Sequence, residues 1–302
     1  MTLQFIADGV VAGSVIALGA IGVTLTYSIL RFANFAHGEL VSAGGYLTLL
    51  LAAAIGSGVA GSMVTLEPLS VGWNVLAAGA IAMVLTGALA LLLDALLFRR
   101  LREQGAAITV VMASFGASMG LRALLEVLFT SKPAYLSRDL AIAEPIGFGM
   151  RATADQLLLV AVTAALAVTL HVVLNRTMLG RAMRAVSENP ALARVIGIDV
   201  TAVVRATWFI GGALACAAGV MLGIVVQVRP HMGFELLLPL FCAAILGGIG
   251  SVPGALLGGL IVGIAESAAV VWLGAEWRAA VSFAVLISLL LIRPQGLFGR
   301  AP

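Results

Sequence analysis

The chain has 302 residues, of which 62% are hydrophobic and only 10% are charged, and its net charge is +3. Its mean hydropathy is +1.14. Soluble globular domains carry about 25% charged residues, so a water-soluble fold is excluded because too few charges remain to cover its surface. The apolar residues form long runs instead of the alternating pattern of barrel strands, which predicts an all-α, polytopic bundle of transmembrane helices.

These apolar runs mark the predicted membrane segments in chain order. The first run is expected to be retained, because no basic head of a cleavable signal peptide precedes it. Glycines near 38–45 predict that the second segment is broken, since broken spans are tolerated where the backbone is buried in protein. The glycine-interrupted run at 235–273 is interpreted as two short spans joined by a tight turn. The runs lie at about residues 5–30, 36–56, 73–98, 106–129, 155–174, 203–228, 235–273 and 277–292.

Together the runs give eight to ten membrane segments in a single transmembrane domain over residues 1–302. Glycine-rich stretches in the two halves suggest an inverted repeat. Arginines follow alternate spans, and the positive-inside rule makes their side cytoplasmic, which puts the N-terminus outside and the C-terminus inside. This distribution reports topology and not nucleic-acid binding. The arginines of this side are Arg31, Arg99, Arg100, Arg102, Arg176, Arg181, Arg184, Arg194, Arg293 and Arg300.

The longest basic loop, at 175–202, contains the signals of a short helix with its own caps. Asn189 suits the N-cap and Pro190 the first helical position. Arg194 suits the negative end of the helix, and Gly197 suits the position just past it, where φ is often positive. Two roles stay open for this helix: it docks in a groove on a partner, or it only anchors the boundary of the membrane.

The chain lacks the motifs of an ATPase or a hydrolase. A phosphate-binding loop needs a lysine after a glycine-rich run, and the only lysine, Lys132, is followed by Pro133. No His-Glu-x-x-His or Gly-x-Ser-x-Gly string is present. Cys216 and Cys242 lie in apolar runs without a partner at metal-ligand spacing, so we expect no metal site. We therefore expect no enzyme and no bound cofactor.

Several charged residues fall inside predicted spans, where they must face protein or water. Arg122 and Glu126 are four residues apart, on one face of a helix, and are expected to pair with each other. We interpret Asn34, His37 and Glu39 as a hydrogen-bonded packing motif near a cytoplasmic entry, and not as a substrate site.

Four strings resemble the branched-chain amino-acid ABC permease family, and they are spread over nearly the whole chain. The first runs from Tyr27 to Glu39, the second is the 180–197 loop, the third runs from Leu246 to Ala255, and the fourth from Arg293 to Gly299. The residues that carry the first three are Asn34, Phe35, His37, Gly38 and Glu39; Gly180, Arg181, Arg184, Glu188, Asn189, Pro190, Arg194 and Gly197; and Gly247, Gly248, Gly250, Pro253 and Gly254.

The resemblance implies an inner-membrane importer with several chains. Its members pair two permease subunits, and a related second chain is favoured over a second copy. Two cytoplasmic ATPase subunits would hold ATP and magnesium, and a periplasmic binding protein would deliver the substrate. The 175–202 loop would then be the coupling loop that receives motion from the ATPase.

The resemblance implies transport of leucine, isoleucine and valine by alternating access. Related permeases move urea, short amides or other amino acids, so these substrates stay open. An ion-coupled secondary transporter using Glu266 or Asp94 is the alternative of another class, and an intramembrane enzyme or scaffold is the third. Dependence on a partner ATPase separates the first reading from the other two.

Overall fold

The computed structural model describes residues 3–58, 67–104, 107–137, 142–147, 149–293 and 295–299. Residues 59–66, between the second and third predicted runs, lie outside the described part of the chain, as do Pro294 and Arg300. Within the described residues, eight helices are long and apolar enough to cross a membrane. The chain is therefore a multi-pass membrane protein, and this count agrees with the lower end of the predicted range.

Helices account for almost all of the regular structure. Asp94–Phe98 forms a π-helical turn that joins two of the helices, and Ala275–Trp277 forms a 3-10 turn. The helices are α1 (Gln4–Leu30), α2 (Ala36–Gly58), α3 (Trp73–Leu93), α4 (Arg99–Gln104), α5 (Ala107–Phe129), α6 (Ala154–Arg176), α7 (Met178–Glu188), α8 (Pro190–Val195), α9 (Val200–Val225), α10 (Met232–Gly247), α11 (Val252–Trp272) and α12 (Arg278–Ile292). Two strands lie in the described part of the chain, β1 (Glu144–Gly147) and β2 (Met150–Ala152), and they pair in antiparallel fashion.

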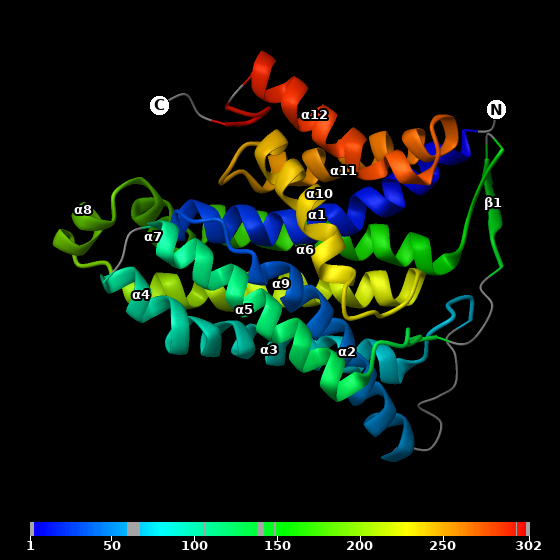
Figure 1. The fold of residues 1–302 in the computed structure, drawn as a ribbon, viewed down its shortest axis with the longest axis horizontal. Helices are drawn as coiled ribbons and strands as arrows, with labels where there is room; N and C mark the ends of the chain where they lie inside the picture. Colours follow the sequence, from blue (N-terminus) through cyan, green and yellow to red (C-terminus); the bar gives the residue numbers. More distant parts are fainter. Residues whose placement is uncertain are drawn as a thin grey trace.

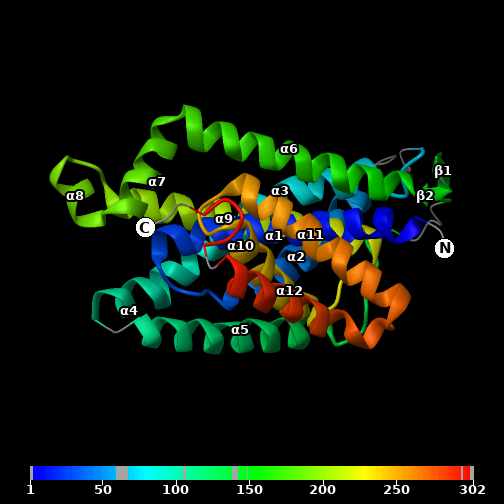
Figure 2. The ribbon, with the colours of Figure 1, turned by 90° about the horizontal axis from the view of Figure 1, so that it is seen from above.

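The bundle is built around two largely buried helices, α1 and α9. Helix α1 packs along α11, and α9 packs against α2 and α3. Helices α6 and α12 lie at the periphery and expose most of their length (Figures 1 and 2). Such apolar, outward-facing helices suit contact with lipid.

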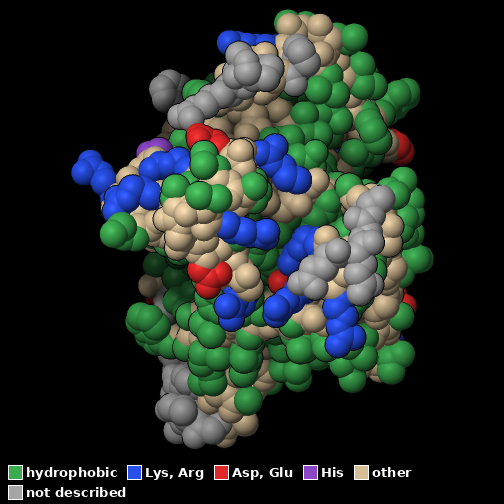
Figure 3. Space-filling model, turned by 90° about the vertical axis from the view of Figure 1, so that its left-hand side faces the viewer, with side chains coloured by type: hydrophobic (Ala, Val, Ile, Leu, Met, Phe, Trp, Pro, Cys, Tyr) green, Lys and Arg blue, Asp and Glu red, His purple; other side chains and the backbone are tan. Residues whose placement is uncertain are grey.

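The two ends of the bundle differ in character. Helices α4, α7 and α8 gather at one end, and the start of α1 and the β1–β2 hairpin lie at the other (Figure 1). Arginines collect on the face around α4, α7 and α8 (Figure 3). Helix α1 starts at the hairpin end, and α12 runs toward the arginine-rich end.

Helix α10 is shorter than the eight candidate spans, the last of which combines the 3-10 turn with α12. It has 16 residues, which at about 1.5 Å per residue gives roughly 24 Å. Residues 226–231 return from the end of α9 into the bundle, where α10 begins (Figure 1). The prediction of two segments joined by a tight turn within 235–273 is confirmed, although α11 is of full spanning length.

The prediction of a broken second segment is wrong, because α2 is one continuous helix from Ala36 to Gly58. Its glycines provide close packing instead of a break. A Cβ on Gly44 would lie 2.5 Å from the Cα of Cys216 in α9, so a larger residue would push the two helices apart. The irregular backbone lies just before α2, in residues 31–35. The inverted repeat stays a prediction.

Candidate functional site

The irregular segment before α2 carries the first family-like string and directs α2 into the bundle. Arg31 ends α1 with a positive φ of 60°, and Asn34 Oδ1 accepts a hydrogen bond from the backbone N–H of Ala36 at 3.1 Å. Helix α5 fixes this segment from the side, because Ser114 Oγ accepts a hydrogen bond from the Phe35 N–H at 3.1 Å. Helix α2 therefore starts inside the protein, with its first turn surrounded by other helices.

The first turns of α2 and α10 cross at two glycines. A Cβ on Gly233 would lie 1.8 Å from the carbonyl oxygen of Gly38, a distance that no side chain can occupy. Ser42 ties the crossing, since its Oγ donates to the carbonyl of Pro230 at 3.1 Å and accepts from the N–H of Gly233 at 3.0 Å. This serine satisfies an N–H in the first turn of α10 that has no partner within its own helix.

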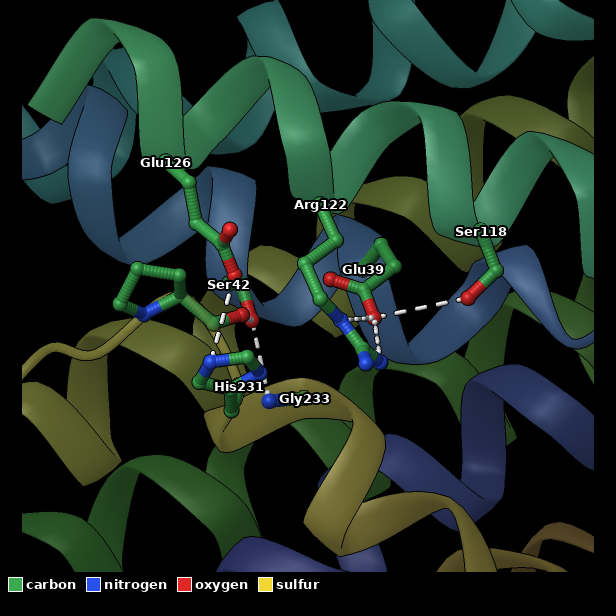
Figure 4. Close-up of polar contacts among 8 residues, drawn as sticks. Glu39, Ser42, Ser118, Arg122, Glu126, His231 and Gly233 are labelled. Atoms are coloured by element: carbon green, nitrogen blue, oxygen red, sulfur yellow. Dashed lines mark hydrogen bonds and ion pairs between the residues drawn. The ribbon is translucent and has the colours of Figure 1, made fainter. Parts of the chain in front are cut away.

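An ion pair with a fully buried carboxylate lies next to this crossing. Glu39 is 0% exposed, and its Oε1 accepts hydrogen bonds from Arg122 Nη2 at 2.7 Å, Arg122 Nε at 3.2 Å and Ser118 Oγ at 3.4 Å (Figure 4). The guanidinium carbon of Arg122 also lies 4.2 Å from the centre of the Phe234 ring. A buried carboxylate is tolerated only when it is paired and hydrogen-bonded in this way.

The second carboxylate oxygen of Glu39 has no such support. Within the described part of the chain, Oε2 is buried and has no hydrogen-bond partner. An unsatisfied buried acceptor costs about 1–3 kcal/mol. The pair thus keeps one free acceptor in the interior, which a hydroxyl, an ammonium or a water molecule can satisfy.

More exposed charges continue from the pair toward the hairpin end of the bundle. Glu126 Oε1 lies 3.2 Å from His231 Nε2, and Arg229 Nη2 lies 3.3 Å from Glu235 Oε2. The side chain of Arg122 is 18% exposed, and that of Glu235 is 56% exposed. The exposure of this row of charged side chains thus increases from Arg122 to Glu235. Since charged side chains avoid lipid, the row faces either protein or water in the assembled molecule.

We call this set the polar junction: Glu39 and Ser42 of α2, Ser114, Ser118, Arg122 and Glu126 of α5, and His231 and Gly233 at the start of α10. The prediction that Arg122 pairs with Glu126 is wrong, because each turns to a different element (Figure 4). One helix face carries both residues, but α2 and α10 bring the oppositely charged partners nearer.

The expected motif of Asn34, His37 and Glu39 is also corrected. All three are buried, but no described hydrogen bond joins their side chains to one another. Asn34 caps α2, His37 packs against Gly22 of α1, and Glu39 turns to α5. Glu39 is fully buried in the interior of the bundle.

The caps predicted in the 175–202 loop are confirmed. Asn189 Oδ1 accepts hydrogen bonds from the N–H groups of Ala191 and Leu192, both at 3.0 Å, and Pro190 is the first residue of α8. Gly197 follows the C-cap with φ of 88°. The loop holds one helix more than predicted, since α7 precedes α8.

Helix α7 carries the other predicted residues of this loop. Gly180 lies against the end of α6, where a Cβ would be 2.1 Å from the Leu174 carbonyl oxygen. Arg184 Nη1 donates to Asn175 Oδ1 at 2.8 Å. Arg181 lies near Met178, and Glu188 is the exposed last residue of α7, whereas Arg194 is in the last turn of α8.

The third string forms the turn between α10 and α11. Gly248 and Gly250 have φ of 94° and 89°, a region that residues with a side chain rarely adopt. Gly247 and Gly254 touch across the turn, and Pro253 lies in the first turn of α11. The fourth string closes the turn, since the N–H of Leu297 donates to the carbonyl of Leu246 at 2.8 Å.

Sequence reasoning missed five members of the polar junction: Ser42, Ser114, Ser118, His231 and Gly233. A signal was present in α5, where Ser114, Ser118, Arg122 and Glu126 recur every four residues and so form one polar stripe. Among the described residues, no cluster of His, Cys, Asp or Glu side chains is placed to hold a metal ion. The charged side chains of the junction already pair with one another.

Comparison with known proteins finds relatives that match nearly the whole chain. A family model described as "Branched-chain amino acid transport system / permease component" matches residues 5–290. The high-affinity branched-chain amino acid transport system permease protein LivH of Escherichia coli is 34% identical over 99% of this chain and 96% of its own length. The corresponding BraD protein of Pseudomonas aeruginosa is 35% identical over the same shares. The fructose import permease FrcC of Rhizobium meliloti is 34% identical over 35% of this chain and 31% of its own length, and no solved structure matches.

Proposed function

The chain belongs to the branched-chain amino acid transport permease family, and on that premise we propose that it is the membrane-spanning subunit of an ATP-driven importer for leucine, isoleucine and valine. The match over residues 5–290 carries the proposal. The relatives that support it are similar from end to end, so the resemblance does not rest on a shared helix or motif alone.

Partner chains supply the energy in this proposal. ATP and magnesium bind two cytoplasmic ATPase subunits, a periplasmic binding protein delivers the substrate, and a related second permease completes the membrane part. The arginine-rich end faces the cytoplasm, which follows the positive-inside rule and puts the start of α1 outside (Figure 3). The β1–β2 hairpin then faces the binding protein.

Helices α7 and α8 are the proposed contact with the ATPase. They project beyond the bundle at the arginine-rich end (Figures 1 and 2). Helix α8 and the residues after it expose apolar side chains, with Leu192 at 58%, Val195 at 82% and Ile196 at 65%. Apolar groups at the tip of a protruding helix suit a groove on a partner protein.

Motion at this tip has a route into the membrane part. Met183, Val186 and Ala193 on the inner side of α7 and α8 form one cluster with Leu25 and Ile29 of α1. Arg31 Nη2 donates to the carbonyl of Ser187 and fastens the end of α1 to the end of α7. A push on α8 therefore reaches α1, which packs along α11 through the depth of the bundle.

The polar junction is the proposed gate of this subunit. Helices α2 and α10 begin there, and their crossing brings buried charges and hydrogen bonds together at one place. Small shifts of either helix change which partner Arg122 and Glu39 contact, while no charge is left in lipid. Alternating access requires such a constriction between the two sides of the membrane.

The test is transport by the reconstituted complex. The tagged chain is purified with its associated subunits, placed in liposomes with ATP inside, and given binding protein with labelled leucine, isoleucine, valine or urea outside. Expected are uptake of the three branched-chain amino acids, no uptake of urea, and loss of uptake when the partner ATPase is inactivated at its own ATP site.

Two results would overturn the proposal in different ways. Uptake of urea without leucine would keep the importer and change its substrate. Full uptake by the purified chain alone, driven by an ion gradient and without an ATPase, would indicate a secondary transporter.

A further inference from the structure

A second polar feature lies apart from the polar junction, in a partly open cavity of about 350 Å³ near the hairpin end of the bundle. The end of α9, the first half of α10, α11, the 3-10 turn and the start of α12 surround it. Ligand pockets in proteins have volumes of about 300–1,000 Å³, so this cavity is large enough for one small molecule.

The walls of the cavity combine both signs of charge with apolar surface. Two guanidinium groups and three carboxylates line it: Arg229, Arg278, Glu235, Glu266 and Glu276. Gln227 and leucine, valine, methionine, proline and alanine side chains form the rest of the lining. A zwitterion with an aliphatic side chain matches all three kinds of surface at once, whereas an inorganic cation would leave the guanidinium groups and the apolar wall unused.

Glu266 is the most distinctive member of the lining. It lies within α11, its residue is only 6% exposed, and Ser282 Oγ of α12 donates a hydrogen bond to its Oε1. A carboxylate buried at membrane depth is costly and is a functional candidate by default. Its position suits the ammonium group of a ligand.

Arg229 offers the complementary group. Its Nη2 lies 3.3 Å from Glu235, but its Nε is buried and has no hydrogen-bond partner within the described part of the chain. That N–H can donate to a ligand carboxylate. Because Arg229 and Glu235 already contact each other, a ligand must compete with an existing pair, and weak binding follows.

We propose that this cavity is a transient binding site for the zwitterionic amino acid, which occupies it between release by the binding protein and passage to the polar junction. The inference rests on the proposed function and on the orientation given above. Its ligand class is an L-amino acid with a branched aliphatic side chain. Glu266 holds the ammonium group, and Arg229 with Arg278 holds the carboxylate.

The experiment uses a diazirine derivative of leucine as the probe. The complete transporter in lipid nanodiscs, without ATP and binding protein, is illuminated with the probe, digested, and mapped by mass spectrometry. Label is expected on peptides of α10 and α12. Excess leucine should remove the label, whereas 4-methylpentanoate, which lacks the amine, and isopentylamine, which lacks the carboxylate, should not.

Two neighbouring alanines of α12 provide matched variants. Both are exposed, but Ala279 lines the cavity and Ala280 does not. Ala279→Trp should lower labelling at least fivefold, and Ala280→Trp should leave it unchanged. Glu266→Gln should lower labelling about tenfold and let 4-methylpentanoate compete as well as leucine. If Glu266→Gln does not assemble, the comparison of Ala279→Trp with Ala280→Trp still tests the site.

Leucine uptake by the unmodified complex is measured in parallel. If the complex takes up leucine but no label appears in α10 or α12, the site is overturned and the proposed function stays intact. The same conclusion follows if Ala279→Trp is labelled as strongly as the unmodified complex. Absence of uptake overturns both.

Discussion

The polar junction and the α7–α8 segment are opposite in composition. The junction places paired charges in the interior of an apolar bundle, where Glu39 is 0% exposed. The α7–α8 segment leaves apolar side chains uncovered at a basic, water-facing end, where Val195 is 82% exposed. Each region therefore differs in polarity from the part of the protein around it. The charges of the junction are stabilised by partners within the chain, whereas the proposed partner of the apolar tip at α8 lies on another chain.

Removal of one charge from the junction should have the largest effect. Arg122→Met leaves Glu39 buried without its partner, which costs about 3–5 kcal/mol. We expect a strongly lowered thermal midpoint of the detergent-solubilised chain, measured by size-exclusion chromatography after heating. The double variant Arg122→Met, Glu39→Gln should recover most of the loss, because no charge is left unpaired. Equal stability of the single variant and the unchanged protein would mean that the pair is not formed.

The crossing of α2 and α10 should be nearly as sensitive. Gly233→Ala adds a methyl group 1.8 Å from the Gly38 carbonyl oxygen, and the forced separation should cost about 1–3 kcal/mol in the same assay. Gly120→Ala in α5 is the control, since a Cβ there meets nothing within 4 Å. The control should be neutral or slightly stabilising, because alanine favours a helix more than glycine does. Equal stability of Gly233→Ala and Gly120→Ala would rule out the close crossing of α2 and α10.

The α7–α8 segment should lose binding without losing stability. Leu192→Asp puts a carboxylate on the exposed apolar tip, and we expect about tenfold weaker association with the ATPase subunits in a pull-down from membranes. Glu188→Arg tests the end of α7 in the same way. Ile146→Asp is the control, since Ile146 is also an exposed apolar residue, at 52%, but lies in β1 at the opposite end of the bundle. Unchanged association in Leu192→Asp would remove α8 from the interface.

The smallest effect is expected for the cap of α8. Asn189→Ala removes two hydrogen bonds to backbone N–H groups, at a cost of about 1 kcal/mol. Asn189→Ser keeps the cap. We expect faster amide hydrogen exchange confined to α8 in the alanine variant, and reduced coupling of ATP hydrolysis to uptake. Exchange unchanged in α8 would show that the cap does not hold the helix.

Local chemistry made part of this structure predictable. The ends of most spans lie within a few residues of the predicted ones, because long apolar runs flanked by arginines leave little choice in a bilayer. The caps at Asn189 and Gly197 were also predictable, since they depend only on neighbouring backbone groups.

The polar junction was not predictable in the same way. The partner of Arg122 is 83 residues away in sequence, and the choice of Glu39 over Glu126 depends on how α2 and α5 lie side by side. The glycines of α2 misled for a related reason. A glycine in a helix indicates either a break or a close neighbour, and only the packing of α9 and α10 distinguishes the two. The β1–β2 hairpin was likewise missed, because its strands are short.

The turn between α10 and α11 has a consequence for biosynthesis. Its backbone hydrogen bonds to Leu297 and Phe298 join residues about 51 positions apart, and α11 and α12 are translated in between. At about 5–20 residues per second, the ribosome needs roughly 3 to 10 s to supply them. During that interval the carbonyls of Leu246 and Gly247 lack these partners, so the turn gains its last backbone hydrogen bonds only after α12 has been made.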